Sequence, residues 1–237
     1  MTDPATSPSK APSPLLSLPG AVAGDGVDAP VAAHYGSFNA EQRTLESGEG
    51  FVDLSHRDVI RISGPERLTW LHSLTTQHFL QLAPKEWTTA LILSPQGHVE
   101  HAFTGYDDGE SFWAHTEPGA AGPLLDWLGR MVFMTRVELA DVTDDWAVAW
   151  RSRADAPTYD LVPRSELAAY AEAAGPACGL WAFEALRMRT VCLPPAPSCS
   201  WARARPPRRS ASSGPRRATT SWARSRWRWS SATCRSR

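Results

Sequence analysis

Two adjacent polar residues, Glu100 and His101, offer the clearest opportunity for acid–base or ligand-binding chemistry in this sequence of 237 residues. They follow the turn Ser94-Pro95-Gln96-Gly97 and are predicted to lie on the second strand of a hairpin. Adjacent residues of a strand point to opposite faces of the sheet, so at most one of the two can face a given cavity. For each residue two interpretations stay open: contact with a ligand, or a simple exposed position on a strand.

The other histidines and acids do not complete a catalytic or metal-binding set. His98 and Glu100 share one face of the predicted strand while His101 takes the other, so no three-ligand cluster forms locally. Asp53 and His56 have no Ser or Cys nucleophile in a recognisable elbow beside them, which favours a structural turn. The sequence therefore predicts neither a metal site nor a nucleophilic catalyst.

The elements that must position these residues begin with a β-branched strand at residues 59–62. Ser63-Gly64-Pro65 ends this strand and begins a helix, because the φ angle of proline suits a first helical turn. Further strands are predicted over residues 88–93, 98–105, 111–115, 137–139 and 146–150, and further helices after a cap at Thr116 and over residues 165–174 and 180–188. Helices mixed with hairpins favour an α+β fold with antiparallel sheets.

Charge is distributed unevenly along the chain. The 24 Lys and Arg residues nearly balance the 25 Asp and Glu residues, but no acid follows Glu184, and 13 arginines lie in residues 187–237. Residues 189–237 are dominated by Arg, Ser, Ala, Pro, Trp and Thr and show no apolar periodicity. We predict a disordered Arg/Trp/Ser-rich tail that results from reading a GC-rich coding sequence out of frame. An arginine-rich RNA-binding segment is the alternative.

Residues 1–32 combine Pro, Ser, Ala and Gly with few large apolar side chains, so we predict a disordered leader. The positive flank and long apolar core of a signal peptide are absent. No apolar run approaches the roughly 20 residues that cross a bilayer. These features predict a cytoplasmic protein that has neither a membrane nor a specific nucleic acid as its partner.

Several motifs follow one another in residues 33–188: Asp53-Leu54-Ser55-His56, residues 60–68, Leu74-Thr75-Thr76, residues 93–100 and residues 180–187. In this order they resemble the folate-binding relatives of the glycine-cleavage T protein, and most closely the YgfZ branch. The resemblance implies a T-protein-like α+β fold, with antiparallel sheets and packed helices, whose central cavity binds tetrahydrofolate. It also implies a protein that supports iron–sulfur enzymes, through cluster assembly or repair, or tRNA modification.

The resemblance places folate contacts at Gly97, Glu100, His101 and Arg187. T proteins carry paired aspartates where this chain has Glu100 and His101, so a folate-binding accessory protein is favoured over the alternative, an aminomethyltransferase. Arg187 either contacts the glutamate tail of a folate or pairs with Glu184 on its own helix. The family's Lys-Gly-Cys-Tyr-x-Gly-Gln-Glu signature and C-terminal barrel domain are missing, so we expect impaired folate binding.

Overall fold

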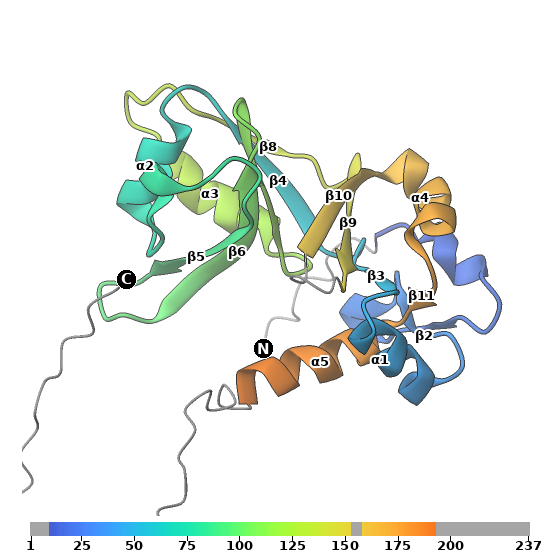
Figure 1. Cartoon of the computed structure of the whole chain (residues 1–237). Coiled ribbons are helices and arrows are strands. Elements are labelled where there is room, and N and C mark those ends of the chain that lie inside the picture. The colour runs from blue at the N-terminus through green and yellow to red at the C-terminus, as the bar shows by residue number, and fades with distance from the viewer. Residues whose placement is uncertain (1–9, 153–157, 193–237) are drawn as a thin grey trace, which may run out of the picture. The chain divides into compact units, whose positions relative to one another are not determined.

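The computed structural model describes residues 10–152 and 158–192, with side chains described as far as residue 188. Within these residues two larger β-sheets and five α-helices form a mixed fold (Figure 1). Most strand pairs are antiparallel, and the predicted α+β class is confirmed. A small third sheet pairs β1 (Val22–Ala23) with β2 (Ala32–His34).

The larger sheet is antiparallel and has the strand order β5-β6-β7-β4-β8. Its strands are β4 (Asp58–Ser63), β5 (Thr88–Leu93), β6 (Val99–Asp107), β7 (Ser111–Thr116) and β8 (Glu138–Asp141). Helices α2 (Arg67–Leu74) and α3 (Ala121–Met131) supply apolar side chains to a buried core with this sheet. Ile60, Ala90 and Phe103 are among the strand residues in that core, and each is at most 2% exposed. Strands β5, β6 and β7 and helix α2 form close to where the sequence predicts them.

The second sheet has the order β10-β9-β3-β11. Its strands are β3 (Phe51–Asp53), β9 (Trp146–Arg151), β10 (Thr158–Pro163) and β11 (Ala177–Cys178), and β11 runs parallel to β3. Helices α1 (Phe38–Glu46) and α5 (Leu180–Cys192) share one core with alternate residues of β9, such as Val148. Helix α4 (Leu167–Ala174) and the 3₁₀ helix η1 (Pro14–Ser17) share another core with the intervening residues, such as Ala149. This sheet is therefore covered on both faces.

Short 3₁₀ helices form several of the connections between the described elements. The 3₁₀ helix η2 (Gly26–Asp28) lies between β1 and β2, and η3 (Phe79–Gln81) lies between α2 and β5. A third 3₁₀ turn, η4 (Arg164–Glu166), links β10 directly to α4.

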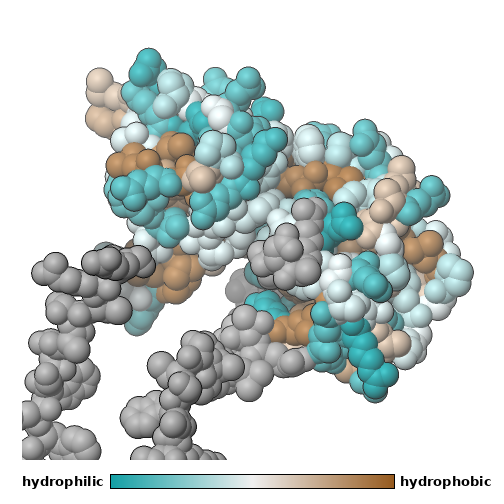
Figure 2. Space-filling model, in the orientation of Figure 1, coloured by the Kyte–Doolittle hydropathy of each residue, from teal (hydrophilic) through white to brown (hydrophobic). Residues whose placement is uncertain are grey.

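The visible surface is largely hydrophilic, with separate apolar patches (Figure 2). Phe133 and Met134, in the loop after α3, are among the most exposed large apolar side chains.

The prediction that Thr116 caps the third helix is wrong. Thr116 ends β7, and its hydroxyl donates a hydrogen bond to the carbonyl of Ala102 at 2.8 Å. Helix α3 begins five residues later, at Ala121, whose amide donates to Oδ2 of Asp58 at 2.9 Å. A carboxylate far away in sequence therefore satisfies an N-terminal amide of the helix, and a search for local capping residues cannot find it.

Strand β10 was not expected from the sequence. It is short, lies at the edge of its sheet and contains both Asp160 and Pro163, which are uncommon inside strands. Its pairing with β9 supplies the main-chain partners that the local sequence does not indicate.

The disordered leader predicted for residues 1–32 is wrong for its described part. From Lys10 onwards the chain packs against the fold: Leu15 is 3% exposed and Val31 is fully buried. The amide of Ser13 donates to the carbonyl of Pro30 at 2.8 Å, and its hydroxyl donates to the carboxylate of Asp53. These contacts are long in range, so composition alone did not reveal them. Residues 1–9 lie outside the described residues.

Helix α5 continues to Cys192, beyond residue 188 where the folded region was predicted to end. The remainder of the predicted tail, residues 193–237, lies outside the described residues. Within the described part of the chain, no helix is both long enough and apolar enough to cross a membrane.

Candidate functional site

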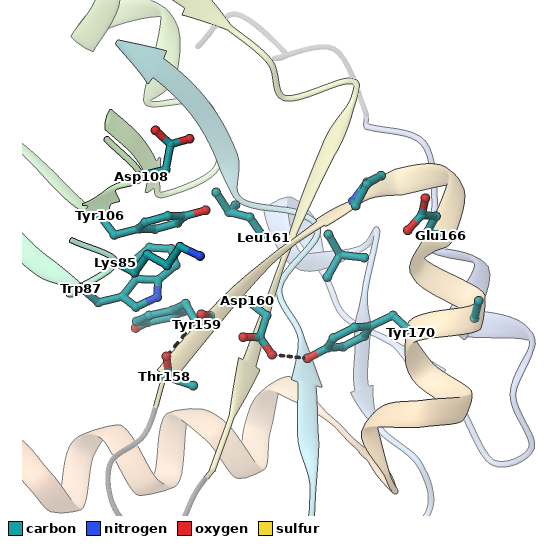
Figure 3. A pocket seen from close by; sticks show the side chains of 13 residues that line it. Lys85, Trp87, Tyr106, Asp108, Thr158, Tyr159, Asp160, Leu161, Glu166 and Tyr170 are labelled. Atoms are coloured by element: carbon teal, nitrogen blue, oxygen red, sulfur yellow. Dashed lines mark hydrogen bonds between the residues drawn. The ribbon is translucent and has the colours of Figure 1, made fainter. Parts of the chain in front are cut away.

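A cavity of about 950 Å³ lies where strand β10 and helix α4 face the larger sheet (Figure 3). Two segments of the chain that are far apart in sequence form its walls. The first contributes Lys85, Trp87, Tyr106 and Asp108, and the second contributes residues 158–163, Glu166, Ala169 and Tyr170. The volume lies within the range of small-molecule and cofactor sites.

Trp87 forms the centre of an aromatic wall. Its ring centroid lies 4.7 Å from that of Tyr106 and 5.3 Å from that of Tyr159, with the rings inclined at 58° and 55°. Figure 3 shows the indole between these two tyrosines. Thr88 pairs with Gly105 in an antiparallel ladder. Trp87 precedes Thr88 and Tyr106 follows Gly105, so the pairing brings these two rings side by side on one face of the sheet.

Polar groups are fixed on both sides of the cavity. The hydroxyl of Tyr170 donates to Oδ2 of Asp160 at 2.8 Å. Asp108 accepts hydrogen bonds from the amides of Glu110 and Ser111 and from the indole of Trp113, at 2.7 to 2.8 Å. The lining thus combines aromatic faces with carboxylates and one ammonium group, that of Lys85.

The electrostatic surroundings shift three of these groups. Burial acts to raise the pKa of Asp108, but hydrogen bonds from the Ser111 and Glu110 amides and from Trp113 bring it below its usual value. Burial, with the nearby charges of Asp108 and Asp160, raises the pKa of Tyr106. Burial also raises the pKa of Tyr159. Both phenols therefore stay protonated at neutral pH and can donate hydrogen bonds.

This arrangement suits a planar ligand that carries N–H groups. Aromatic faces hold a flat ring by stacking. Carboxylates accept paired hydrogen bonds from an amidine-like edge. Within the described residues no group of three or more His, Cys, Asp or Glu side chains is placed to hold a metal ion.

None of the four residues predicted to contact a ligand lines this cavity. Gly97 lies in the exposed turn between β5 and β6, with φ +83° and its amide donating to the carbonyl of Ser94 at 2.9 Å. Glu100 is exposed, whereas His101 is half-buried with its ring 6.2 Å from that of Trp127 on α3. The structure brings these three together only as neighbours on one hairpin.

Arg187 lies apart from the other three, on α5. Its guanidinium donates to Oε2 of Glu184 at 2.6 and 2.8 Å, which is the helix pair that the sequence left as one alternative. Its positive charge nevertheless acts on Tyr159 of the cavity wall. Of the four predicted residues, Arg187 is thus the one with an electrostatic link to the cavity.

The residues that do line the cavity were missed for two reasons. Trp87 directly precedes the strand predicted over residues 88–93, and no local pattern marks Trp87, Tyr106 or Tyr170 as ligand contacts. Tyr159 and Asp160 belong to strand β10, which was not predicted. The signal present in the sequence is the aromatic enrichment itself, in Trp87, Tyr106, Tyr159 and Tyr170, but nothing local indicates that these rings meet.

Comparisons with known proteins match part of this chain to one protein family. The model of the GCVT N-terminal domain matches residues 16–149. A chloroplastic protein of Arabidopsis thaliana, At1g60990, whose name describes it as a candidate transferase, is 25% identical over 111 residues, covering 45% of this chain and 26% of that protein. The crystal structure of the glycine cleavage system aminomethyltransferase T from Bartonella henselae matches with a TM-score of 0.64 and 15% identity. That match covers 74% of this chain and 60% of the other, so this chain spans less than two thirds of either relative.

Proposed function

Because this chain belongs to the GCVT N-terminal domain family, we propose that it binds a tetrahydrofolate and that the cavity beside Trp87 receives the pterin ring. The similarity to the solved aminomethyltransferase establishes the fold and supports the proposal to that extent. The residues of the cavity supply the remaining support.

The observation that carries the proposal is the aromatic and acidic lining of one cavity. A pterin is a flat bicyclic ring whose 2-amino group and neighbouring ring N–H point in the same direction. Tyr106 and Tyr159 offer faces for such a ring, and Asp160 lies beside them on the wall (Figure 3). A carboxylate has about four lone-pair sites, so Asp160 can accept further hydrogen bonds while it binds the hydroxyl of Tyr170.

The single cation of the lining, Lys85, suits the other end of the ligand. The glutamate tail of a folate carries carboxylates, and Lys85 lies near Trp87 and Tyr106 at the cavity wall (Figure 3). Asp108, Asp160 and Glu166 make the rest of the lining acidic. We therefore assign the pterin to the side of Tyr159 and Asp160 and the tail to the side of Lys85.

We further propose an accessory role in iron–sulfur cluster assembly or repair, or in tRNA modification, in preference to aminomethyl transfer. The transfer alternative requires a carboxylate at the reacting nitrogen of the folate. Glu100 is exposed on the hairpin and His101 contacts Trp127 on the helix side of the sheet, so neither reaches the cavity. Their placement supports binding without transfer.

Calorimetric titration with 5-formyltetrahydrofolate tests the proposal. We expect saturable binding of this folate by the unaltered protein. Asp160→Asn is expected to weaken it about tenfold, because a hydrogen bond to a charged acceptor becomes a neutral one. Asp126→Asn, at an exposed position of α3, is the matched control. No saturable binding by the unaltered protein would refute folate binding.

The composition of residues 189–237 supports a separate proposal, that the reading frame changes near residue 187. Translation of the underlying DNA in the other two frames beyond that codon tests it. Appearance of Lys-Gly-Cys-Tyr-x-Gly-Gln-Glu is expected. If neither frame contains this motif, the arginine-rich RNA-binding tail becomes the better reading, and it predicts an affinity for RNA that falls steeply with salt.

A further inference from the structure

His115 on β7 contacts two aromatic residues of the cavity wall. Its ring centroid is 4.5 Å from that of Tyr159 and 5.8 Å from that of Trp87. The residue is 2% exposed, and its Nε2 atom has no hydrogen-bond partner among the described residues. Buried polar atoms are normally paired, so this nitrogen requires an explanation.

The neighbouring guanidinium decides which ring nitrogen of His115 carries the proton. Nη1 of Arg57 lies 3.4 Å from Nδ1 of His115, and a guanidinium can only donate. Nδ1 is therefore the acceptor. Burial, and then the charge of Arg57, lower the pKa of His115 well below its ordinary value, so the ring is neutral at pH 7. The proton must then sit on Nε2, which is a hydrogen-bond donor without an acceptor.

Contacts of Arg57 with other residues hold its guanidinium beside Nδ1 of His115, and this restricts the orientation of the imidazole ring. Nη2 of Arg57 lies 3.1 Å from Oε1 of Glu117, and its guanidinium carbon lies 5.9 Å from the ring centroid of Phe183. The side chain of Arg57 is 8% exposed. The donor is thus prearranged beside the cavity rather than free to rotate away.

His115 does not line the cavity, but Trp87 and Tyr159, which its ring contacts, both do. The indole contacts the rings of Tyr106, Tyr159 and His115. Within residues 10–152 and 158–188 no hydrogen bond of its N–H group is found, and the indole contacts three rings. The segment before it includes Lys85, whose backbone is in the left-handed region at φ 63°. Another flat ring could make similar contacts with these three rings.

We propose that the planar ring of the ligand takes the place of the Trp87 indole between Tyr106 and Tyr159 and accepts a hydrogen bond from Nε2 of His115. The inference rests on the proposed folate-binding function, and it names His115 as the residue that selects rings with an acceptor on their edge. A pterin has such acceptors in its oxo group and ring nitrogens. Displacing Trp87 lowers the apparent affinity, because only part of the protein is open at any time.

Two amide substitutions separate the two nitrogens of His115. Glutamine places an N–H group near the position of Nε2, whereas asparagine places its amide near Nδ1 and can keep the contact with Arg57. In calorimetric titration with 5-formyltetrahydrofolate, His115→Asn is expected to weaken binding about tenfold, and His115→Gln to stay within about threefold of the unaltered protein. Equal affinity of His115→Asn and the unaltered protein would overturn the inference.

Substitution of the indole tests the exchange. Trp87→Ala is expected to strengthen binding a few-fold, because no side chain has to leave, whereas Tyr106→Ala is expected to weaken it. Trp181→Ala, at an exposed position of α5, is the matched control and should change nothing. A loss of affinity in Trp87→Ala as large as in Tyr106→Ala contradicts the exchange.

The failure of each proposal is distinguishable. If the unaltered protein does not bind the folate, the proposed function falls and this inference falls with it. If it binds and the His115 variants behave alike, only the inference falls. Should a His115 variant not fold, the imidazole ¹H–¹⁵N resonances of the unaltered protein decide: the Nε2 proton is expected to shift on ligand addition, and an unchanged resonance refutes the contact.

Discussion

The ion pair between Arg67 and Asp107 ties the beginning of α2 to the end of β6. Nε and Nη2 of Arg67 lie 2.7 and 2.8 Å from the two carboxylate oxygens, and both side chains are buried. Asp107 also accepts the amide of Gly109 at 2.9 Å, so the pair helps to fix the turn that carries Asp108. A paired arginine thereby supports one wall of the cavity without lining it.

Replacement of this arginine is expected to destabilise the protein strongly. Arg67→Met leaves the buried carboxylate of Asp107 without its partner, which should lower the free energy of unfolding by about 3 kcal/mol. Urea denaturation measures the change. Arg136→Met is the matched control, because the Arg136 side chain is 73% exposed and its surface pair with Glu66 is expected to contribute little to stability. Similar losses in both variants would contradict the assignment.

The N-terminal segment that includes η1 connects the two larger sheets. Nζ of Lys10 contacts the carboxylate of Asp58 in β4 and donates to the carbonyl of His56 at 2.8 Å. Ser13 binds Asp53 in β3, and Leu15 enters the core between that sheet and α4. A segment poor in apolar residues is thus ordered by a few contacts, each with a different strand or loop.

The two leucines of this segment allow a paired test. Leu15 is 3% exposed and Leu18 is 37% exposed, so they differ in burial while sharing their local sequence. Leu15→Ala is expected to lower the free energy of unfolding by about 2 to 3 kcal/mol, through lost burial and a remaining cavity. Leu18→Ala should cost less than about 1 kcal/mol. If Leu15→Ala is as mild as Leu18→Ala in urea denaturation, the segment does not stabilise the fold.

At the scale of the whole molecule, buried ionisable groups set how stability responds to acid. Burial, with the charges of Arg57 and Lys10, lowers the pKa of His56 to about 3. Burial raises the pKa values of Asp53 and Asp28. The histidine and the carboxylic acids have opposite effects on how the free energy of unfolding changes with pH. The folded state resists protonation of the histidine but favours protonation of these carboxylic acids.

The histidine contribution can be isolated by comparison with a variant. Between about pH 6.5 and pH 3 the unfolded chain binds a proton at residue 56 and the folded chain does not, so this contribution to stability is complete above about pH 6.5 and is lost as the pH falls. From about pH 7 to pH 5, His56→Gln is expected to lose less stability than the unaltered protein in urea denaturation. His98→Gln, on the exposed turn after β5, is the control and should follow the unaltered protein. If the free energy of unfolding changes equally with pH in the unaltered protein and both variants, the lowered pKa of His56 is refuted.

The sequence by itself determined the fold class, the family resemblance and most of the regular elements. Residues 88–93 form a strand with the predicted bounds, and the helix after Pro65 forms as α2. These elements are encoded locally, by β-branched runs, apolar periodicity and turn residues. The same local signals placed Gly97, Glu100 and His101 on one hairpin, where they lie.

Only the tertiary structure decided where a ligand could bind. The cavity is lined by Trp87, just before β5, by Tyr106 of β6, and by Tyr159 and Asp160 of β10. The ring of His115 contacts two of these residues, Trp87 and Tyr159. No local pattern links these residues, because their proximity follows from the packing of β10 and α4 against the larger sheet. Likewise, residues 10–32 become ordered through hydrogen bonds that span up to 48 residues and through packing of Leu15 in a core with Leu167 of α4. Long-range packing, unlike helix or strand periodicity, leaves no signature in a single stretch of sequence.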